Sequence, residues 1–200
     1  MRRWKRVLAI VVVAALAFAL EGWIASAQAA SPMFHTCTYT RTAATGAERP
    51  PYSLAPTLGL VKVVVDTSAG PIELELDRRQ APCAVHSLDH LALRGFYDGT
   101  SCDRLTATLL ECAPADAGYT FRAEASGRET YPRGTVALSG TGSHGSRFFV
   151  VHQQVDLPAR YTVVGRVVAG IGVLDNVVAG GIGADGRPRT PVTITDVRVG

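Results

Sequence analysis

Several residue types and motifs are scarce in this sequence of 200 residues, and each absence excludes a class of protein. Charged residues make up only 18% of the chain, and part of the net charge of +3 comes from the opening M-R-R-W-K-R, so nucleic acid is a poor candidate partner. The sequence has no C-x-x-C pair and no cluster of histidines, which argues against a structural zinc site. Both tryptophans, Trp4 and Trp23, lie near the N-terminus, so the sequence after residue 30 contains no tryptophan. We expect no metal, no cofactor and no nucleic-acid partner.

Common catalytic motifs are also missing. There is no G-x-S-x-G elbow, and the S-H-G-S run at 143–146 places serine and histidine side by side in a loop, where they rarely reach each other. The G-G-I-G run at 180–183 has neither a preceding strand nor a lysine, which argues against a phosphate-binding loop. His86 and His90 share a predicted helix, but no third metal ligand is evident, so we interpret them as solvated.

The longest apolar run lies near the N-terminus, between residues 7 and 20. Basic residues precede the run, Glu21 ends it, and a small-residue A-x-A pattern follows at 25–29, as is typical of a secretory signal peptide. The run is shorter than the roughly 20 apolar residues that a membrane span needs. Residues 22–25 could extend it, so an N-terminal membrane anchor remains the alternative. Both interpretations of residues 1–30 predict an exported domain, secreted or anchored at the outer face of the cytoplasmic membrane.

All four cysteines follow this N-terminal segment. An even number of cysteines in an oxidising compartment predicts up to two disulfides. Cys102 and Cys112 flank a predicted hairpin, which favours that pair and leaves Cys37 with Cys83, although the sequence does not determine connectivity. Residues 31–59 are rich in proline, alanine and threonine, and we interpret them as an extended linker that precedes the folded domain.

Residues 60–200 form a predicted mainly β domain with two helices. Residues that alternate between apolar and polar, bounded by turn signals, predict the strands Val61–Asp66, Ile72–Asp77, Ser101–Leu105, Leu109–Cys112, Tyr119–Glu124, Thr135–Ser139, Arg147–His152, Tyr161–Val168 and Val192–Val199. We expect Ser101–Leu105 to pair with Leu109–Cys112. Helical spacing predicts one helix between Pro82 and Gly95 and a second over Val173–Ala179. Many short strands with few helices indicate an antiparallel barrel or sandwich.

The stretch from Gly134 to Val151 combines a strand, a loop of glycine and serine, and a second strand that carries Phe148 and Phe149. Neighbouring residues of a strand point to opposite faces. One phenylalanine can therefore belong to the core while the other forms the floor of an outer surface.

The order of these elements resembles that of cyclophilins, the β-barrel family of peptidyl-prolyl cis-trans isomerases. The resemblance covers about residues 60–200 and is carried by T-S-A-G-P-I at 67–72, A-P at 81–82, G-F-Y-D-G at 95–99, Arg104, Y-P-R-G-T-V-A-L at 131–138, G-S-R-F-F at 145–149, Y-T-V-V-G-R-V at 161–167 and the tail at 188–199. It implies a closed antiparallel eight-stranded barrel capped by two helices. The predicted export and the cysteines are similar to those of secreted or membrane-tethered cyclophilins of high-G+C Gram-positive bacteria.

The reaction that the resemblance implies is rotation about an X–Pro bond, against which amide resonance sets a barrier of roughly 18–20 kcal/mol. A catalyst needs an apolar pocket for the proline ring and a fixed donor directed at the twisted amide, but no nucleophile and no metal. By resemblance, Arg104 is that donor. The resemblance also implies a set of substrate-binding residues, namely Leu109, Glu111, Leu138, Ser139, Gly140, Arg147, Phe149, Leu157 and Tyr161.

Residues around Arg104 depart from the family pattern. Thr108 and Glu111 stand where the family usually has phenylalanine and glutamine, while Asp103 and Arg147 replace a frequent histidine and a second glutamine. Glu111 would form an ion pair with Arg104, which either positions the guanidinium or offsets its charge. Arg147 either replaces the lost positive field or pairs with Glu111.

These departures predict a weak isomerase of exported proteins. A non-catalytic cyclophilin-like module that binds prolyl peptides or proteins is the alternative, because a fold does not guarantee an activity. We expect a monomer whose partners are proline-containing peptides or unfolded exported proteins, with a possible membrane tether through the N-terminal segment.

Overall fold

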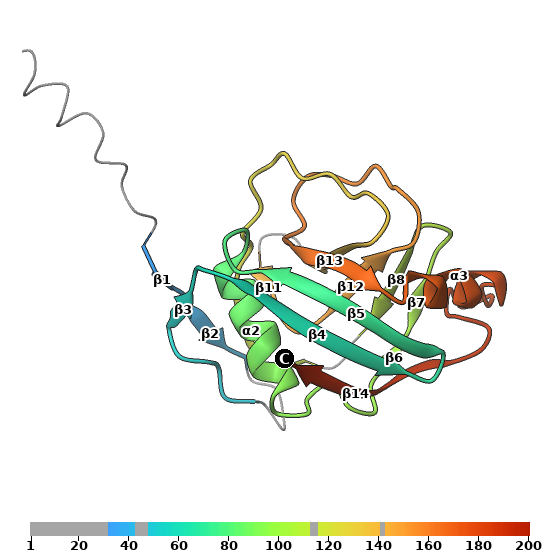
Figure 1. The fold of residues 1–200 in the computed structure, drawn as a ribbon, viewed down its shortest axis with the longest axis horizontal. Helices are drawn as coiled ribbons and strands as arrows, with labels where there is room; N and C mark the ends of the chain where they lie inside the picture. The colour runs from blue at the N-terminus through green and yellow to red at the C-terminus, as the bar shows by residue number, and fades with distance from the viewer. Residues whose placement is uncertain (1–31, 43–47, 113–115, 141–142) are drawn as a thin grey trace, which may run out of the picture. The chain divides into compact units, whose positions relative to one another are not determined.

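The computed structural model describes residues 32–42, 48–112, 116–140 and 143–200 (Figure 1). The signal peptide or anchor predicted for residues 1–30 lies outside these ranges. The chain from Met33 to Gly200 forms one compact unit. Within the described ranges, no helix is long and apolar enough to span a bilayer.

Most of the described strands belong to one antiparallel sheet, whose order is β6-β14-β4-β5-β13-β10-β12-β8-β7. Its strands are β4 (Leu60–Thr67), β5 (Gly70–Asp77), β6 (Ser101–Cys102), β7 (Arg104–Leu105), β8 (Leu109–Cys112), β10 (Thr135–Leu138), β12 (Phe148–Val151), β13 (Val163–Ala169) and β14 (Val192–Val199). The end strands β6 and β7 are separated in sequence by Asp103 alone, so the ends of the sheet nearly meet. The predicted antiparallel barrel is confirmed, nearly closed and with nine strands among the described residues instead of eight.

The strand predicted over Ser101–Leu105 is divided in the structure. Its first part, β6, pairs with β14, whereas its second part, β7, pairs with β8. Only the second part has the predicted partner, because the chain crosses at Asp103 from one end of the sheet to the other. The disulfide between Cys102 and Cys112 joins β6 to β8 across this junction and confirms the preferred pairing.

Alternating apolar side chains fill the barrel. Val63 on β4 lies opposite Leu74 on β5, and both are buried, whereas the intervening Lys62 and Glu73 are exposed. Burial of each such side chain contributes about 1.5–3 kcal/mol to folding. The same alternation along the other strands separates an interior face from an outer face, and the outer face carries the site described below.

The two predicted helices are α2 (Pro82–Ala92) and α3 (Ile171–Ala179), which lie at opposite sides of the view in Figure 1. Proline suits the first turn of α2 because its fixed φ is helical and its missing N–H is not needed there. Val85, Leu88 and Leu91 recur at helical spacing and are buried against the core. The helix α3 begins two residues earlier than predicted.

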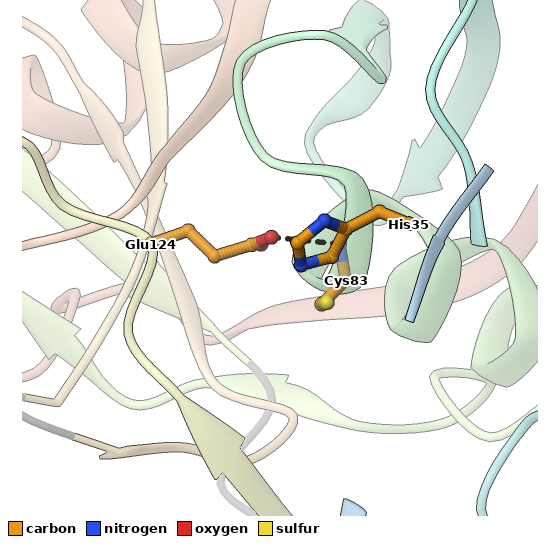
Figure 2. A group of neighbouring side chains, drawn as sticks. All are labelled: His35, Cys83 and Glu124. Atoms are coloured by element: carbon orange, nitrogen blue, oxygen red, sulfur yellow. Dashed lines mark hydrogen bonds between the residues drawn. The ribbon is translucent and has the colours of Figure 1, made fainter. Parts of the chain in front are cut away.

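The N-terminus of α2 is capped from outside the helix. The N-cap residue Ala81 has no capping side chain, and the Glu124 carboxylate instead accepts a hydrogen bond from the backbone N–H of Cys83 at 3.0 Å (Figure 2) and another from that of Ala84 at 2.8 Å. Burial raises the pKa of the Glu124 carboxyl above its ordinary value, and the two N–H donors and the His35 ring oppose that rise. The positive end of the helix dipole favours the ionised carboxylate.

The residues before the barrel differ from the linker predicted for 31–59. Of this range the structure describes 32–42 and 48–59, which contain β1 (Phe34–Thr36), β2 (Tyr39–Arg41) and β3 (Leu54–Pro56). The strand β1 pairs with β3, and β2 joins a small sheet with β9 (Tyr119–Arg122) and β11 (Ser143–His144). The predicted disulfide between Cys37 and Cys83 ties this extension to α2.

Contacts distant in sequence explain why this extension folds. Tyr39 packs edge-on against Tyr119 and Phe121, with ring centroids 5.6 and 5.5 Å away. Such contacts supply the buried apolar surface that the composition of residues 31–59 lacks by itself. The extension therefore belongs to the folded domain.

His86 and His90 of α2 also contact this extension, which corrects their interpretation as solvated. The Nε2 atom of His86 lies 3.1 Å from the carbonyl oxygen of Tyr52, and that of His90 lies 2.7 Å from the carbonyl oxygen of Arg49. Partial burial lowers the pKa of His86, while its contact with Tyr52 opposes the change. The two imidazoles hold the extension against the helix.

Candidate active site

A hollow of about 190 Å³ opens beside β7, β8 and β12. Its lining consists of Arg104, Leu109, Glu111, Ser139, Gly140, Phe149, Leu157 and Tyr161. All of these were predicted site residues. Six of them come together because β10, β12, β8 and β7 are consecutive neighbours in the sheet, although their sequence order is different. Leu157 and Tyr161 come from the segment between β12 and β13.

Phe149 forms the floor of the hollow. It is buried in a cluster with Leu109, Tyr131 and Val151 on the outer side of the sheet. Its neighbour Phe148 belongs to the interior core. The two phenylalanines therefore divide between the faces as the sequence predicted.

Two tyrosines support this floor from the side. The Tyr161 ring stands perpendicular to Phe149 with centroids 5.5 Å apart, and Tyr131 lies 6.2 Å from Tyr161. The Tyr131 hydroxyl donates to the carbonyl oxygen of Pro158 at 3.1 Å and accepts from the Tyr161 N–H at 3.2 Å. Tyr131 thus anchors the segment that carries Leu157 and Tyr161, a role that no local pattern in the sequence indicates.

Leu138 does not line the hollow, contrary to its prediction as a wall of the cleft. It is fully buried in the interior core and lies opposite Phe148 in the strand pairing. Ala137 lies opposite Phe149 and belongs to the cluster under the hollow. Because strand residues alternate between faces, it is Ala137, one residue earlier, that points to the side of the sheet on which the hollow lies.

Ser139 and Gly140 lie at one edge of the hollow, but the Ser139 N–H is not directed at a ligand. It donates to the carbonyl oxygen of Arg147 at 2.9 Å, and the Ser139 carbonyl lies 3.2 Å from Nδ1 of His144. A carbonyl oxygen has two lone pairs, so this one can still accept a second hydrogen bond. Gly140 has a φ of 112°, which favours glycine.

The buried His144 holds this edge in place. Its Nδ1 faces the Ser139 carbonyl, which can only accept, so Nδ1 carries the proton. Its Nε2 lies 2.7 Å from the Thr162 hydroxyl. Burial lowers the pKa of His144, which favours the neutral ring. Since both ring nitrogens are engaged in this way, His144 does not serve as the base for a neighbouring serine.

Four charged side chains meet beside the hollow. Nη1 of Arg104 donates to Oε2 of Glu111 at 3.2 Å, and Nη1 of Arg147 donates to Oε1 at 3.4 Å. Nη2 of Arg147 also lies 3.6 Å from Oδ2 of Asp103. The nearly buried Glu111 carboxylate is therefore compensated by two guanidinium groups, as a buried charge requires. Glu111 pairs with Arg104 as predicted, and Arg147 pairs with Glu111 as one alternative predicted.

Neither Arg147, which was predicted to bind substrate, nor Thr108 is among the residues that line the hollow. Arg147 reaches the site through its contact with Glu111. Thr108 belongs to the turn between β7 and β8, where its hydroxyl lies 3.2 Å from that of Thr106. The hollow therefore has an apolar floor and wall, with its charged residues on one side.

A second group outside the hollow has metal-binding residue types. His35, Cys83 and Glu124 bring candidate ligand atoms within 4.8 Å of one another (Figure 2). However, the Cys83 sulfur is bonded to Cys37, and both Glu124 oxygens accept hydrogen bonds from α2. In the part of the chain that the structure describes, this group is a helix cap beside a disulfide.

Residues 61–199 match the family described as "Cyclophilin type peptidyl-prolyl cis-trans isomerase/CLD", a range that includes the whole lining of the hollow. The chain belongs to the cyclophilin family. This cyclophilin is 36% identical over 165 residues to the "Probable peptidyl-prolyl cis-trans isomerase B" of Mycobacterium tuberculosis, covering 68% of this chain and 54% of that protein. The protein of the same name from Mycobacterium leprae is 36% identical over 167 residues, with coverages of 70% and 57%.

This cyclophilin spans about half the length of these curated relatives, whose coverage is 54% and 57%. Its fold is also that of a solved cyclophilin type peptidyl-prolyl cis-trans isomerase from Cryptosporidium parvum, crystallised in the presence of the dipeptide Ala-Pro. The TM-score is 0.63 at 20% identity, covering 70% of this chain and 98% of that chain.

Proposed function

We propose that this cyclophilin is a weak peptidyl-prolyl cis-trans isomerase that acts on X–Pro bonds of exported proteins. The observation that carries the proposal is the Arg104 guanidinium at the edge of an apolar hollow with Phe149 as its floor. The family and the printed names of the mycobacterial relatives support the activity.

The hollow suits a single proline ring. Its volume of about 190 Å³ is below the roughly 300 Å³ at which sites for drug-sized ligands begin. Phe149, Leu109 and Leu157 supply an apolar surface for the ring. The Cryptosporidium protein was crystallised in the presence of a dipeptide that contains proline, Ala-Pro, which supports proline-containing peptides as partners here.

Arg104 assists the rotation by hydrogen bonding and charge. As the imide twists, its nitrogen becomes pyramidal and regains a lone pair, which a fixed cationic donor stabilises more than it stabilises the planar ground state. The guanidinium stays charged and keeps its direction. Its side chain is 61% exposed, so it reaches solvent and a bound peptide despite its contact with Glu111. The reaction needs no proton transfer and no covalent intermediate.

Glu111 is the reason that we propose a weak activity. Its carboxylate lies 3.2 Å from Arg104, and it offsets part of the positive charge that the arginine offers to the twisted amide. Asp103 adds a second negative charge nearby, held by Arg147. Export is supported by the two disulfides, which are typical of oxidising compartments, and by the N-terminal sequence pattern.

The test is isomerisation of a proline tetrapeptide by wild type and Arg104→Ala. We expect kcat/KM to fall by roughly 10²-fold, the scale on which loss of one fixed donor acts. Arg166→Ala is the matched control. Arg166 on β13 forms an ion pair with Glu75 on β5, and neither residue lines the hollow. Equal rates for wild type and Arg104→Ala would overturn the proposal.

A second candidate function is a non-catalytic module that binds prolyl peptides. The ion pairs around Glu111 favour it, because they hold the guanidinium groups in a fixed network. Peptide binding, measured by fluorescence anisotropy, without any acceleration of isomerisation would identify this alternative.

A further inference from the structure

We infer that Arg147, together with Arg104, forms an anion subsite beside the prolyl hollow, so that the preferred substrates carry an acidic residue close to the proline. The inference rests on the proposed function, since it names the substrate class of the same site. It begins with how the four charges of the network are distributed between the surface and the interior.

The positive groups of this network are more exposed to solvent than the negative groups. The side chain of Arg104 is 61% exposed and that of Arg147 is 38% exposed, whereas Glu111 is 7% exposed and Asp103 is 20% exposed. The four charges cancel in sum, but a peptide approaching from solvent meets the guanidinium groups first. The exposed segment around Leu157 adds one charge of each sign, Asp156 and Arg160, and leaves this balance unchanged.

Arg147 lies within reach of a peptide whose proline occupies the hollow. It precedes β12 directly and points to the same face as Phe149, two residues along the chain, which corresponds to about 7 Å. Its carbonyl accepts the Ser139 N–H, which holds Arg147 next to the Ser139–Gly140 edge of the hollow. An extended peptide advances about 3.3 Å per residue, so a residue two positions from the proline lies near this guanidinium.

The contacts that Arg147 makes within the protein are long, so a peptide carboxylate can form shorter hydrogen bonds with its guanidinium. Its nitrogens lie 3.4 Å from Glu111 and 3.6 Å from Asp103, longer than the roughly 2.7–2.9 Å of a good charge-assisted hydrogen bond. A peptide carboxylate that binds both terminal nitrogens would form shorter contacts and a fork-to-fork geometry that arginine favours. A lysine at the same place would meet like charge, so the subsite discriminates by repulsion as well as by attraction.

The test uses a panel of fluorescent peptides that contain one proline, with Glu, Gln or Lys placed at each position within two residues of it. Isomerisation is measured by kcat/KM and binding by anisotropy, at low and at high salt. We expect Glu to be favoured over Gln by about fivefold at one of these positions, the scale of a well-formed exposed ion pair. Lys should be disfavoured there, and the preference should shrink in high salt because the charges are exposed.

Three variants assign the preference to Arg147. The ratio of the rates for the Glu and Gln peptides is compared within each variant, so that changes in overall activity cancel. Arg147→Gln should bring the ratio close to one, and Arg147→Glu should reverse it in favour of Lys. Arg166→Gln, which removes an equal charge away from the hollow, should retain the wild-type ratio.

The outcomes separate this inference from the proposed function. If wild type isomerises Glu, Gln and Lys peptides equally, the anion subsite is overturned and the isomerase remains. If no peptide is isomerised, the proposed function fails, and the binding ratios then decide: a Glu preference lost in Arg147→Gln supports the subsite, and equal affinities overturn it. A preference that survives in Arg147→Gln also overturns it.

Discussion

The Glu111 carboxylate is the residue on which the chemistry of this site depends. It is nearly buried, and Arg104 and Arg147 each donate to one of its oxygens, which compensates for placing a carboxylate there. The same contacts fix the two guanidinium groups at the edge of the hollow. In the proposed mechanism Glu111 has two effects on Arg104, since it holds the guanidinium in place and offsets part of its positive charge. A neutral residue of the same shape would separate these effects.

We therefore expect Glu111→Gln to raise kcat/KM for a proline peptide by about threefold to tenfold. A glutamine oxygen can still accept from Arg104 but does not offset the positive charge offered to the twisted amide. Glu75→Gln is the control, since Glu75 pairs with Arg166 on the barrel wall at 3.0 Å and should leave the rate unchanged. A lower rate in Glu111→Gln would show that the carboxylate serves only to position the arginine.

His144 makes the stability of the protein depend on pH. Burial lowers its pKa below the ordinary value of 6.5, so the unfolded chain binds the proton more tightly than the folded chain does. The contribution of His144 to stability is therefore complete above about pH 6.5 and is lost as the pH drops toward the folded pKa. His86 contributes in the same direction, because its pKa is also lowered.

The measurement is the free energy of unfolding in urea at about pH 7.5 and about pH 5.5, for wild type and His144→Gln. The loss on acidification should be smaller in the variant, by up to about 1.4 kcal/mol for each pH unit of the window. An equal loss in both proteins would mean that His144 does not account for the acid sensitivity.

At the scale of single residues, the sequence predicted which residues belong to the site but not the direction of every side chain. The lining of the hollow was anticipated from motif positions, and the division of Phe148 and Phe149 followed from strand alternation. Leu138 was assigned to the cleft although the same alternation, counted from Phe149 through the strand pairing, points to Ala137. All four residues of β10 are buried, so the apolar pattern of this strand does not distinguish its two faces, and the pairing with β12 in the folded sheet does.

Among the elements, α2 shows how a helix terminus can depend on a residue distant in sequence. Ala81 cannot cap the helix, and Glu124, which follows β9, supplies both acceptors for the N–H groups of Cys83 and Ala84. Most strands of the barrel and both helices followed from local patterns, and the hairpin spacing favoured the observed disulfide pairing without determining it. The cap and the folded extension at 32–42 and 48–59 did not, because their partners are distant in sequence.

We expect Glu124→Ala to lower the free energy of unfolding by about 1–2 kcal/mol, the usual cost of a lost cap with buried donors. Glu129→Ala is a matched control, because Glu129 also accepts from two backbone N–H groups, those of Ser126 and Gly127, in an exposed loop. That change should cost less than about 0.5 kcal/mol. Similar losses in the two variants would contradict the capping role.

At the scale of the whole molecule, two disulfides constrain the chain over different lengths. The bond between Cys37 and Cys83 spans 46 residues and holds the N-terminal extension, whereas that between Cys102 and Cys112 spans 10 residues. In the chain-entropy description, the longer loop contributes about 4 kcal/mol and the shorter about 3 kcal/mol.

Paired serine substitutions test this division. Replacing Cys37 and Cys83 by serine should lower the denaturation midpoint more than replacing Cys102 and Cys112 does. The second pair of substitutions should instead have the larger effect on kcat/KM, because that bond lies beside β7 and its Arg104. Denaturant unfolding and peptide isomerisation measured on the same samples check both statements.

The position of Asp103 between the first and last strands of the barrel has a consequence for how the protein matures. Arg104 follows directly, so its final position depends on both ends of the sheet, β6 with β14 on one side and β7 with β8 on the other. Under the proposed function, a chain in which these two ends are still apart lacks the native arrangement around Arg104. Catalysis during refolding should therefore not recover before the two ends of the sheet meet.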